Sequence, residues 1–273
     1  MTRPTILEDR LVAFIDILGF REIIKGMADE PGKADFIRDV LKIVQKQERK
    51  ISRERRNEER RIRRHTGRTA WLLPPARLEM TAFSDCYVIS SAWERGWDVL
   101  VAAQALAALM LYKGILIRGG IVRGKAYHER RVLFGPAVIA AYELQEHAAR
   151  YPRIVVEDHI VRSEWLLSVM KKEFFLRDSD GCWFLTPFQR SISRLSTLLP
   201  ELRPEQAESD FHTRVRDHIV QQLSTQLRCR NRNWDHIAKL RWLAARFNDA
   251  LASELIAGVA SIDLDRPRVP VPI

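Results

Sequence analysis

Short apolar runs alternate with segments of helical periodicity over the first 190 residues. Apolar runs and alternation predict strands at 11–17, 77–91, 115–122, 132–134, 153–156 and 174–188, two of these segments folding as hairpins. Apolar positions at helical spacing predict helices at 21–27, 36–44, 97–112 and 136–150. The pattern predicts an α+β fold, a mostly antiparallel sheet with helices on one face.

The two predicted hairpins have definite turns. The first turn falls at Phe83-Ser84-Asp85, which places Asp85 at a tip, and the second at residues 177–181. We expect the strand of residues 115–122 to end before a turn that starts at Gly124-Lys125.

After Pro187 the pattern becomes helical, with predicted helices at 192–199, 205–229 and 234–255. We therefore expect one domain over residues 1–190, a helical extension over 191–260 and an extended tail over 261–273. Residues 46–70 form a charged insertion within the first domain. There Arg, Lys and Glu interleave almost without apolar residues, which is typical of a solvated helix or a flexible insertion.

The 273 residues carry a net charge of +10, which favours an anionic partner such as a nucleotide, a nucleic acid or an acidic lipid. We do not expect nucleic acid to bind at residues 46–68, because the glutamates weaken the field and stacking aromatics are missing. The longest apolar stretch, residues 99–112, is too short for a membrane span. The first residues show no signal peptide, and the three cysteines form no CxxC pair. We expect a cytoplasmic protein without structural zinc.

Two carboxylates stand out by position. Asp16 lies late in the first apolar run, where an unpaired charge is costly to bury, so it is either paired or holds a metal. If the first strand neighbours the hairpin, Asp16 and Asp85 project at the same edge and form an oxygen site of the kind that Mg²⁺ or Mn²⁺ prefers. The N–H groups of Leu18, Gly19 and Phe20 then face a polyphosphate at the start of the next helix.

Several motifs resemble those of the class III nucleotide cyclases. The stretch Phe14–Phe20 (FIDILGF) resembles the first metal-binding motif of that family, and Phe83–Tyr87 (FSDCY) resembles the second. Residues 117–124 (IRGGIVRG) are similar to its glycine-bearing strand, and residues 134–138 (FGPAV) to its next strand–helix turn. Order and spacing agree over residues 10–160, so the resemblance implies a class III nucleotidyl cyclase fold.

Within that family, the chain is most similar to the Pycsar pyrimidine cyclase branch, which comprises bacterial antiphage enzymes. Besides residues 117–124, the stretches that carry this similarity are 134–144, 151–155, 178–181 and 239–243. The resemblance implies a homodimer with active sites at the subunit interface. It also implies two Mn²⁺ or Mg²⁺ ions per site on Asp16, the Ile17 carbonyl and Asp85. Attack of the substrate 3′-hydroxyl on the α-phosphate then releases pyrophosphate.

The chain departs from adenylate cyclases where they bind base and ribose. Thr81 stands at the position of their adenine-reading Lys, and Val132 at that of their second base-reading residue, which disfavours ATP. Ile139 and Glu143 stand where those enzymes carry Asn and Arg. Another cation must then stabilise the transition state, and the candidate catalytic residues are Arg118, Arg123 and Lys125. The expected substrate-binding residues are Phe14, Leu18, Gly19, Phe20, Thr81 and Tyr142.

Simpler interpretations of these residues stay open. Arg118 can pair with Glu79 across the sheet, and Tyr142 can pack in the core. For the whole chain we expect a uridylate cyclase that converts UTP to cyclic UMP. The alternatives are a cytidylate cyclase acting on CTP, an inactive cyclase-fold nucleotide sensor, or a protein that binds nucleic acid through residues 46–68.

Overall fold

A computed structural model describes residues 6–25, 35, 38, 42, 78–129, 132–164, 174–188, 207–254, 256–264 and 267. The predicted charged insertion and the helices predicted at 36–44 and 192–199 lie outside these residues, apart from single positions. Most of the predicted extended tail, at 265, 266 and 268–273, lies outside them as well.

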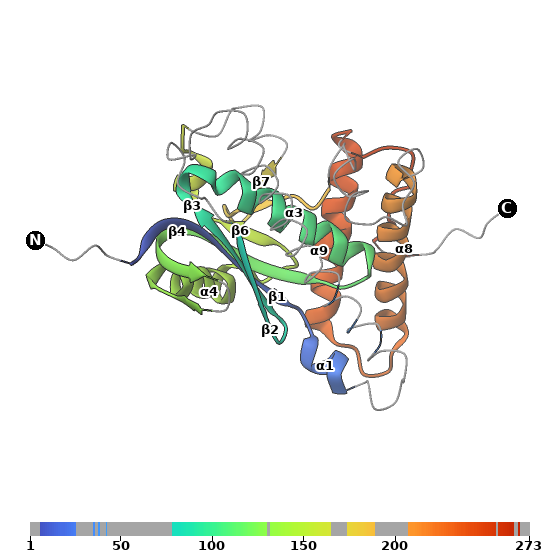
Figure 1. Cartoon of the computed structure of the whole chain (residues 1–273). Helices are drawn as coiled ribbons and strands as arrows, with labels where there is room; N and C mark the ends of the chain where they lie inside the picture. Colours follow the sequence, from blue (N-terminus) through green and yellow to red (C-terminus); the bar gives the residue numbers. More distant parts are fainter. Residues whose placement is uncertain are drawn as a thin grey trace, which may run out of the picture.

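The described strands form one sheet of eight, in the order β2-β3-β1-β4-β6-β8-β7, with β5 paired to β4 (Figure 1). Its members are β1 (Glu8–Ile17), β2 (Glu79–Phe83), β3 (Cys86–Ala92), β4 (Ile117–Glu129), β5 (Val132–Phe134), β6 (Ile154–Val156), β7 (Phe175–Arg177) and β8 (Trp183–Leu185). The pairing of β4 with β6 is parallel, and every other described pair is antiparallel. The predicted α+β class and both predicted hairpins are confirmed.

The predicted turn at Gly124-Lys125 is wrong. Strand β4 continues through these residues to Glu129, and its antiparallel register with β1 runs from Ile17 opposite Ile117 to Glu8 opposite Ala126. The long partner strand supplies ladder hydrogen bonds along this length, so a glycine in the interior does not end the strand.

Helices cover both faces of the sheet, so the prediction of helices on one face is wrong. Successive side chains of β1 alternate between faces. Leu11 and its i+2 neighbours pack with α3 (Gly96–Tyr112), whereas Val12 packs with α4 (Pro136–Ala148). Each face of β1 therefore has its own helix. The short helices are α1 (Phe20–Lys25), η1 (Trp93–Arg95) and α5 (Asp158–Val161).

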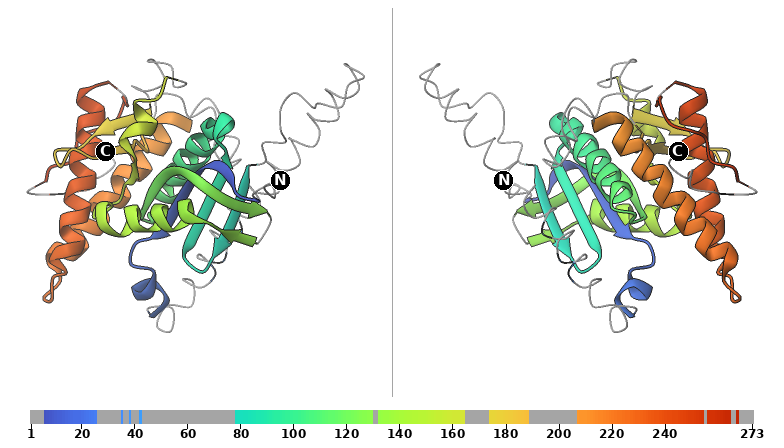
Figure 2. Two further views of the ribbon diagram at one scale, coloured as in Figure 1. Left: turned by 90° about the vertical axis from the view of Figure 1, so that its left-hand side faces the viewer. Right: turned by 90° about the vertical axis from the view of Figure 1, so that its right-hand side faces the viewer.

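Two long C-terminal helices, α8 (Ala207–Arg228) and α9 (Trp234–Ala252), lie side by side at one flank of the sheet (Figure 2). They confirm the helices predicted at 205–229 and 234–255. Their apolar faces enclose a second core, which also includes Tyr112 at the end of α3 and Leu116 before β4. Among the described helices, we find none that combines the length and the apolar character needed to cross a membrane.

A buried ion cluster joins α9 to the sheet. Arg153, at 2% exposure just before β6, pairs with Asp178 and Asp180 in the β7–β8 turn. From α9, Trp242 Nε1 donates to Asp178 at 2.8 Å and Arg246 pairs with the same carboxylate at 3.3 Å. Breaking such a buried cluster leaves an uncompensated charge, so it holds the three elements together.

Close packing of α4 on β4 requires glycine at position 120. A Cβ atom there would lie 2.5 Å from the carbonyl oxygen of Ala141 and 2.8 Å from the amide nitrogen of Gln145. Both neighbours are helix backbone and cannot rotate away.

We predict that Gly120→Ala lowers the free energy of unfolding by about 1–3 kcal/mol, the usual cost of overpacking. Urea denaturation measures this change. The matched control is Gly124→Ala, whose Cβ would meet the Ala137 Cβ at 3.2 Å and therefore needs only a small shift. Equal losses in the two variants would contradict the close approach at position 120.

Candidate functional site

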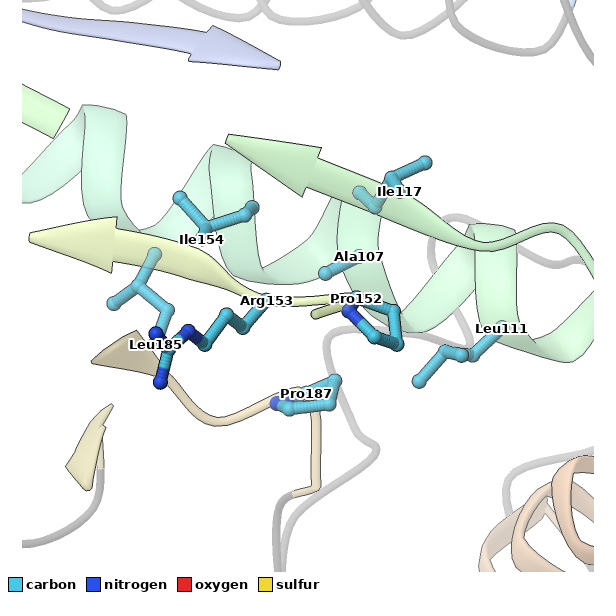
Figure 3. Close-up of a pocket in the computed structure, with 8 residues that line it drawn as sticks. All are labelled: Ala107, Leu111, Ile117, Pro152, Arg153, Ile154, Leu185 and Pro187. Carbon is cyan, nitrogen blue, oxygen red and sulfur yellow. The ribbon is translucent and has the colours of Figure 1, made fainter. Parts of the chain in front are cut away.

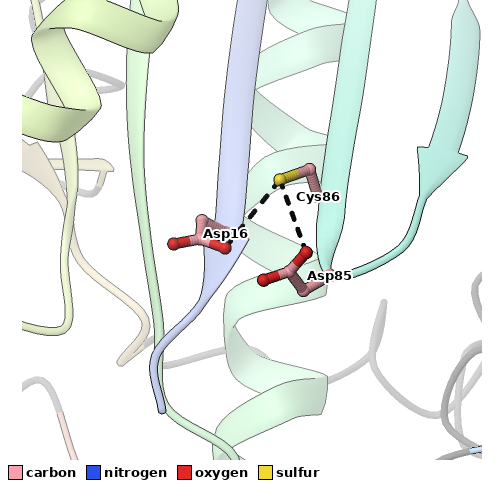
Figure 4. A group of neighbouring side chains, drawn as sticks. All are labelled: Asp16, Asp85 and Cys86. Carbon is pink, nitrogen blue, oxygen red and sulfur yellow. Dashed lines mark hydrogen bonds between the residues drawn. The ribbon is translucent and has the colours of Figure 1, made fainter. Parts of the chain in front are cut away.

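Two strand ends bring Asp16 and Asp85 together (Figure 4). Asp16 lies one residue before the end of β1, opposite Cys86 in β3, and Asp85 occupies the two-residue turn between β2 and β3. Ser84, the first residue of that turn, has a φ of 54°, as tight hairpin turns require. One ligand atom from each of Asp16, Asp85 and Cys86 lies within 4.8 Å of the others. The register of β1 with β3 therefore builds the cluster.

A third oxygen faces the same place. The N–H of Ile17 donates to the Asp85 carbonyl at 3.1 Å, and the N–H of Leu18 donates to the Leu116 carbonyl at 2.9 Å. The Ile17–Leu18 peptide is trans, so its carbonyl points opposite to its N–H. Since that N–H points to the segment before β4, the Ile17 carbonyl points to the hairpin side, where Asp85 lies.

Burial of Asp16 raises the pKa of its carboxyl, an effect that Arg118 opposes and the negative Asp85 reinforces. The Cys86 Sγ lies 3.9 Å from one oxygen of each aspartate. Burial, with further contributions from both carboxylates, raises the pKa of Cys86 to about 12. The thiol therefore stays protonated and donates toward the two carboxylates, which makes it a poor metal ligand in this state.

The donor set fits a hard divalent cation. Two carboxylates and a backbone carbonyl are the ligands that Mg²⁺ and Mn²⁺ prefer, and such ions complete their coordination with water and substrate phosphate. The like charges of Asp16 and Asp85 disfavour each other, so a cation between them relieves the repulsion.

Arg118 supplies the positive charge next to Asp16. It lies opposite Asp16 in the β1–β4 register, and its Nε donates to Asp16 Oδ2 at 3.3 Å while its Nη2 donates to Glu146 at 3.0 Å. The buried Gln145 carboxamide, oriented with its oxygen toward Arg118, accepts from Nη2 at 3.0 Å and Nε at 2.6 Å. The alternative pairing of Arg118 with Glu79 is not what the structure shows.

The predicted phosphate cradle needs one correction. The amide of Leu18 is not available, because it donates to Leu116. Gly19 has a φ of 73° and open space where a Cβ would lie, and its carbonyl accepts the N–H of Ile23. Phe20 begins the six-residue helix α1. The N–H groups of Gly19 and Phe20 precede Ile23, the donor of the first intrahelical hydrogen bond, so helix α1 itself offers them no acceptor.

Thr81 lies on the same face of the sheet as Asp16, because it pairs with Val88, two residues beyond Cys86. Its Oγ1 lies 2.9 Å from His128 Nε2, and His128 Nδ1 lies 2.8 Å from Ser90 Oγ. Ser90 Oγ in turn accepts from Arg10 Nε at 3.0 Å. Burial, reinforced by Arg10, lowers the pKa of His128 to about 4, so a neutral imidazole holds the Thr81 hydroxyl.

Arg123 and Lys125 do not lie at the carboxylates. They stand five and seven residues from Arg118 along β4, so at about 3.3 Å per residue Arg123 is about 16 Å away. An odd separation also places both on the opposite face. Arg123 binds Asp9 at 2.6 Å and covers the Trp93 ring at 4.0 Å.

Phe14 and Tyr142 meet beside the site. Their rings make an edge contact with centroids 5.4 Å apart, and Tyr142 is 48% exposed, so it does not pack in the core as the simpler interpretation has it. Ile139, one turn before Tyr142, is 61% exposed, and Glu143 is also exposed. Neither residue contributes a positive charge near Asp16.

The pocket in Figure 3 lies elsewhere, between α3 and β6. It has a volume of about 10 Å³, which is room for about one water molecule. Its lining residues are Ala107, Leu111, Ile117, Pro152, Arg153, Ile154, Leu185 and Pro187. It contains neither aspartate, so the candidate site lies apart from this pocket.

Sequence reasoning missed three residues that contact the aspartates or Arg118. Cys86 was inside the quoted FSDCY motif, and its place opposite Asp16 follows once β1 and β3 are paired in register. Gln145 and Glu146 reach Arg118 from α4, across the glycines of β4. Helical periodicity could place these two on α4, but their partner depends on how that helix crosses the sheet.

No family model matches the chain, and no curated protein matches its sequence. Similar solved structures include the adenylyl cyclase CyaB from P. aeruginosa, with a TM-score of 0.40 and 17% identity over 66% of this chain and 94% of that one. A bacterial light-regulated adenylyl cyclase has a TM-score of 0.41 and 13% identity over 71% of this chain and 98% of that one. The catalytic core of a rhodopsin-guanylyl cyclase with converted specificity, in complex with ATPαS, has a TM-score of 0.38 and 16% identity over 66% of this chain and 96% of that one. Values this low assign no function to the chain.

The carboxylates beside Cys86 predict how its thiol reacts. Replacing Asp16 by Asn removes one of the negative charges that raise the pKa of Cys86, so the thiolate fraction at pH 8.5 rises. We expect faster alkylation of Cys86 by iodoacetamide, about tenfold for each pKa unit lowered. Mass spectrometry of the Cys86 peptide measures the rate. Asp158→Asn, at an exposed carboxylate in α5, should leave the rate unchanged, and slower alkylation of Asp16→Asn would contradict the electrostatic picture.

Proposed function

We propose that this protein is a nucleotide cyclase that forms 3′,5′-cyclic UMP and pyrophosphate from UTP. In this reaction the substrate 3′-oxygen forms a bond to the α-phosphorus, the bond from that phosphorus to the bridging oxygen of the β-phosphate breaks, and the hydroxyl proton leaves to solvent. The observation that carries the proposal is the meeting of Asp16 and Asp85 at the end of β1 and the β2–β3 turn, with the Ile17 carbonyl directed to the same side.

The proposed cofactors are two Mn²⁺ or Mg²⁺ ions held by these three groups. When bound, such ions neutralise the triphosphate and lower the pKa of the attacking hydroxyl. The chain itself orients the ligands. The β1–β3 register fixes Asp16 opposite Cys86, and the hairpin turn presents Asp85. The hydrogen bond from the Leu18 N–H to the Leu116 carbonyl sets the direction of the Ile17 carbonyl.

Arg118 is the candidate cation of the described site. It already lies 3.3 Å from Asp16, and its three acceptors hold the guanidinium in place. Once cations offset the charge of Asp16, Arg118 can turn one N–H toward a phosphate oxygen. Arg123 and Lys125 enter this proposal only as residues supplied by a second subunit, because they lie on the opposite face of their own chain.

Substrate choice rests on Thr81, Phe14 and Tyr142. Thr81 replaces the long adenine-reading lysine with a short hydroxyl that His128 holds on the Asp16 face. Phe14 and the half-exposed Tyr142 offer aromatic surface suitable for a base or ribose, with Val88 between Phe14 and Thr81 in the strand register. A hydroxyl suits both pyrimidines because it can donate and accept, so CTP is the close alternative to UTP.

We propose a homodimer with the active sites at its interface. Large apolar side chains are exposed on the hairpin, β5 and α4, namely Phe83, Val132, Phe134, Ile139 and Tyr142. A second copy of this chain would remove that surface from water. The cytoplasmic location and a second-messenger role in bacterial antiphage defence rest on the sequence resemblance alone.

An inactive nucleotide sensor is the second candidate function. The observation that favours it is the lack of a cation on α4, where the exposed Ile139 and Glu143 stand in place of a ribose-binding Asn and a catalytic Arg. Losing one such donor typically costs about 10²–10³ in rate. A sensor would bind UTP with metal but release no pyrophosphate.

We predict cyclic UMP and pyrophosphate when the purified chain is incubated with UTP and Mn²⁺. CTP should give less product and ATP or GTP little, as chromatography with mass spectrometry measures. Asp16→Asn and Asp85→Asn should each lower the rate by at least about 10²-fold, since each removes an ion ligand. Asp158→Asn serves as the matched carboxylate control. Nucleotide binding without turnover would favour the sensor, and activity surviving both aspartate changes would overturn the site.

The dimer can be tested through the exposed apolar surface. Ile139→Asp places a charge in the proposed interface, so sedimentation equilibrium should show dissociation to monomers and activity should fall with it. Trp234→Asp is the control, because Trp234 is equally exposed at 61% but lies on α9. Dissociation by Trp234→Asp and not by Ile139→Asp would place the interface on the C-terminal helices instead.

A further inference from the structure

The turn after Asp16 and Ile17 is anchored in two separate cores. The Leu18 side chain packs against the core enclosed by α8, α9 and the end of α3. Phe20 and Ile23, just beyond Gly19, pack against the core between the sheet and α3. The positive φ of Gly19 lets the chain turn between these two anchors. The C-terminal helices therefore contact the segment that follows directly on the candidate ion ligands.

A series of hydrogen bonds leads from α8 to the same turn. Gln222 Nε2 in α8 donates to the Gly114 carbonyl at 2.7 Å. His218, one turn earlier in α8, has ring atoms 3.2 Å from where a Gly114 Cβ would lie, so the helix closely covers this loop. Two residues later, the Leu116 carbonyl accepts the Leu18 N–H at 2.9 Å. Helix α8 is thus bonded to the loop at 113–116, and this loop is bonded to the Leu18 amide.

This series determines where one candidate ligand points. The Leu18 N–H and the Ile17 carbonyl belong to the same rigid peptide plane, so fixing the N–H on Leu116 aims the carbonyl at the hairpin side. If the loop at 113–116 moves, the carbonyl moves with it. Such partners behind a ligand orient it and tune its affinity for a metal.

We propose that α8 is a positioning element of the ion site, acting through Gln222 and the loop at Gly114 on Leu18 and the Ile17 carbonyl. The inference rests on the proposed function in that Asp16, Ile17 and Asp85 must bind divalent ions. It gives the C-terminal helices a role in the reaction, since a change in how α8 seats on the loop alters ion affinity without touching an ion ligand.

The test is a titration of the full-length chain with Mn²⁺, followed by electron paramagnetic resonance of the free ion. Leu18→Ala removes the side-chain anchor, and Gln222→Met removes the donor while keeping the length of the side chain. Each should weaken Mn²⁺ binding by about tenfold or more, within the range that outer-sphere partners of metal ligands show. Leu18→Met restores an apolar anchor and should bind close to the wild type.

The controls separate this inference from the proposed function. Gln221→Met changes the neighbouring exposed glutamine of α8 and should bind Mn²⁺ as the wild type does. Asp16→Asn should abolish tight binding. If Asp16→Asn weakens binding but Leu18→Ala and Gln222→Met do not, the positioning role is wrong and the ion site stands. If the wild type binds no Mn²⁺, the ion site and this inference both fall.

Melting temperatures show whether each variant folds. Should Leu18→Ala fail to fold, Gln222→Met carries the decision, because it changes a single hydrogen bond at a partly buried position. A Gln222→Met variant with an unchanged melting temperature and weakened Mn²⁺ binding supports positioning. The same variant with unchanged binding overturns it.

Discussion

The antiparallel register of β1 with β3 is the constraint on which the candidate site depends. It sets Asp16 opposite Cys86 and so brings Asp16 beside the turn that carries Asp85. Burial raises the pKa of Asp16, and the negative charge of Asp85 adds to this effect. Two donors reduce the repulsion between the carboxylates: Arg118 lies on one side of Asp16, and the protonated Cys86 thiol lies between the two carboxylates. An arrangement that gathers negative charge in this way is suited to a cation.

Helix packing secures this arrangement from both sides of the sheet. On one face, Gly120 lets α4 approach β4 closely enough for Gln145 and Glu146 to hold Arg118. At the flank, the C-terminal pair covers the loop before β4, whose Leu116 carbonyl fixes the Leu18 amide. Gly120 therefore acts on Arg118, and the C-terminal helices act on the Leu18 amide, two groups close to Asp16, although Gly120 and these helices lie far from it in sequence.

Sequence patterns predicted the elements well and their contacts only in part. The apolar run with Asp16 and the hairpin with Asp85 were both predicted, and their meeting follows from pairing adjacent strands. The turn at Gly124-Lys125 was wrong because a long partner strand outweighs local glycine preference. The pairing of Arg118 with Glu79, which the sequence left open as an alternative, was wrong as well. The partners of Arg118 are Asp16 on β1 and two residues of α4, and no periodicity tells which face of the sheet a helix will cover. Likewise, the Leu18 amide was expected to be free, but its acceptor lies 98 residues away in a loop.

The same reasoning explains why substrate choice is harder to derive than ion binding. Ion ligands need only oxygen atoms at the right place, and these follow from strand register. Base recognition depends on single hydrogen bonds, and here Thr81 is tied to a buried chain through His128 and Ser90 that sequence spacing does not reveal. The aromatic pair of Phe14 and Tyr142 likewise forms across two elements.

The most direct test of the ion site is a crystal structure of the full-length chain with Mn²⁺ and a UTP analogue that cannot cyclise, measured at the manganese absorption edge. The account predicts anomalous peaks about 2.0–2.6 Å from oxygens of Asp16, Asp85 and the Ile17 carbonyl, with the α-phosphate beside them. Anomalous density elsewhere, with Arg118 still bound to Asp16 and no ion between the aspartates, would contradict it.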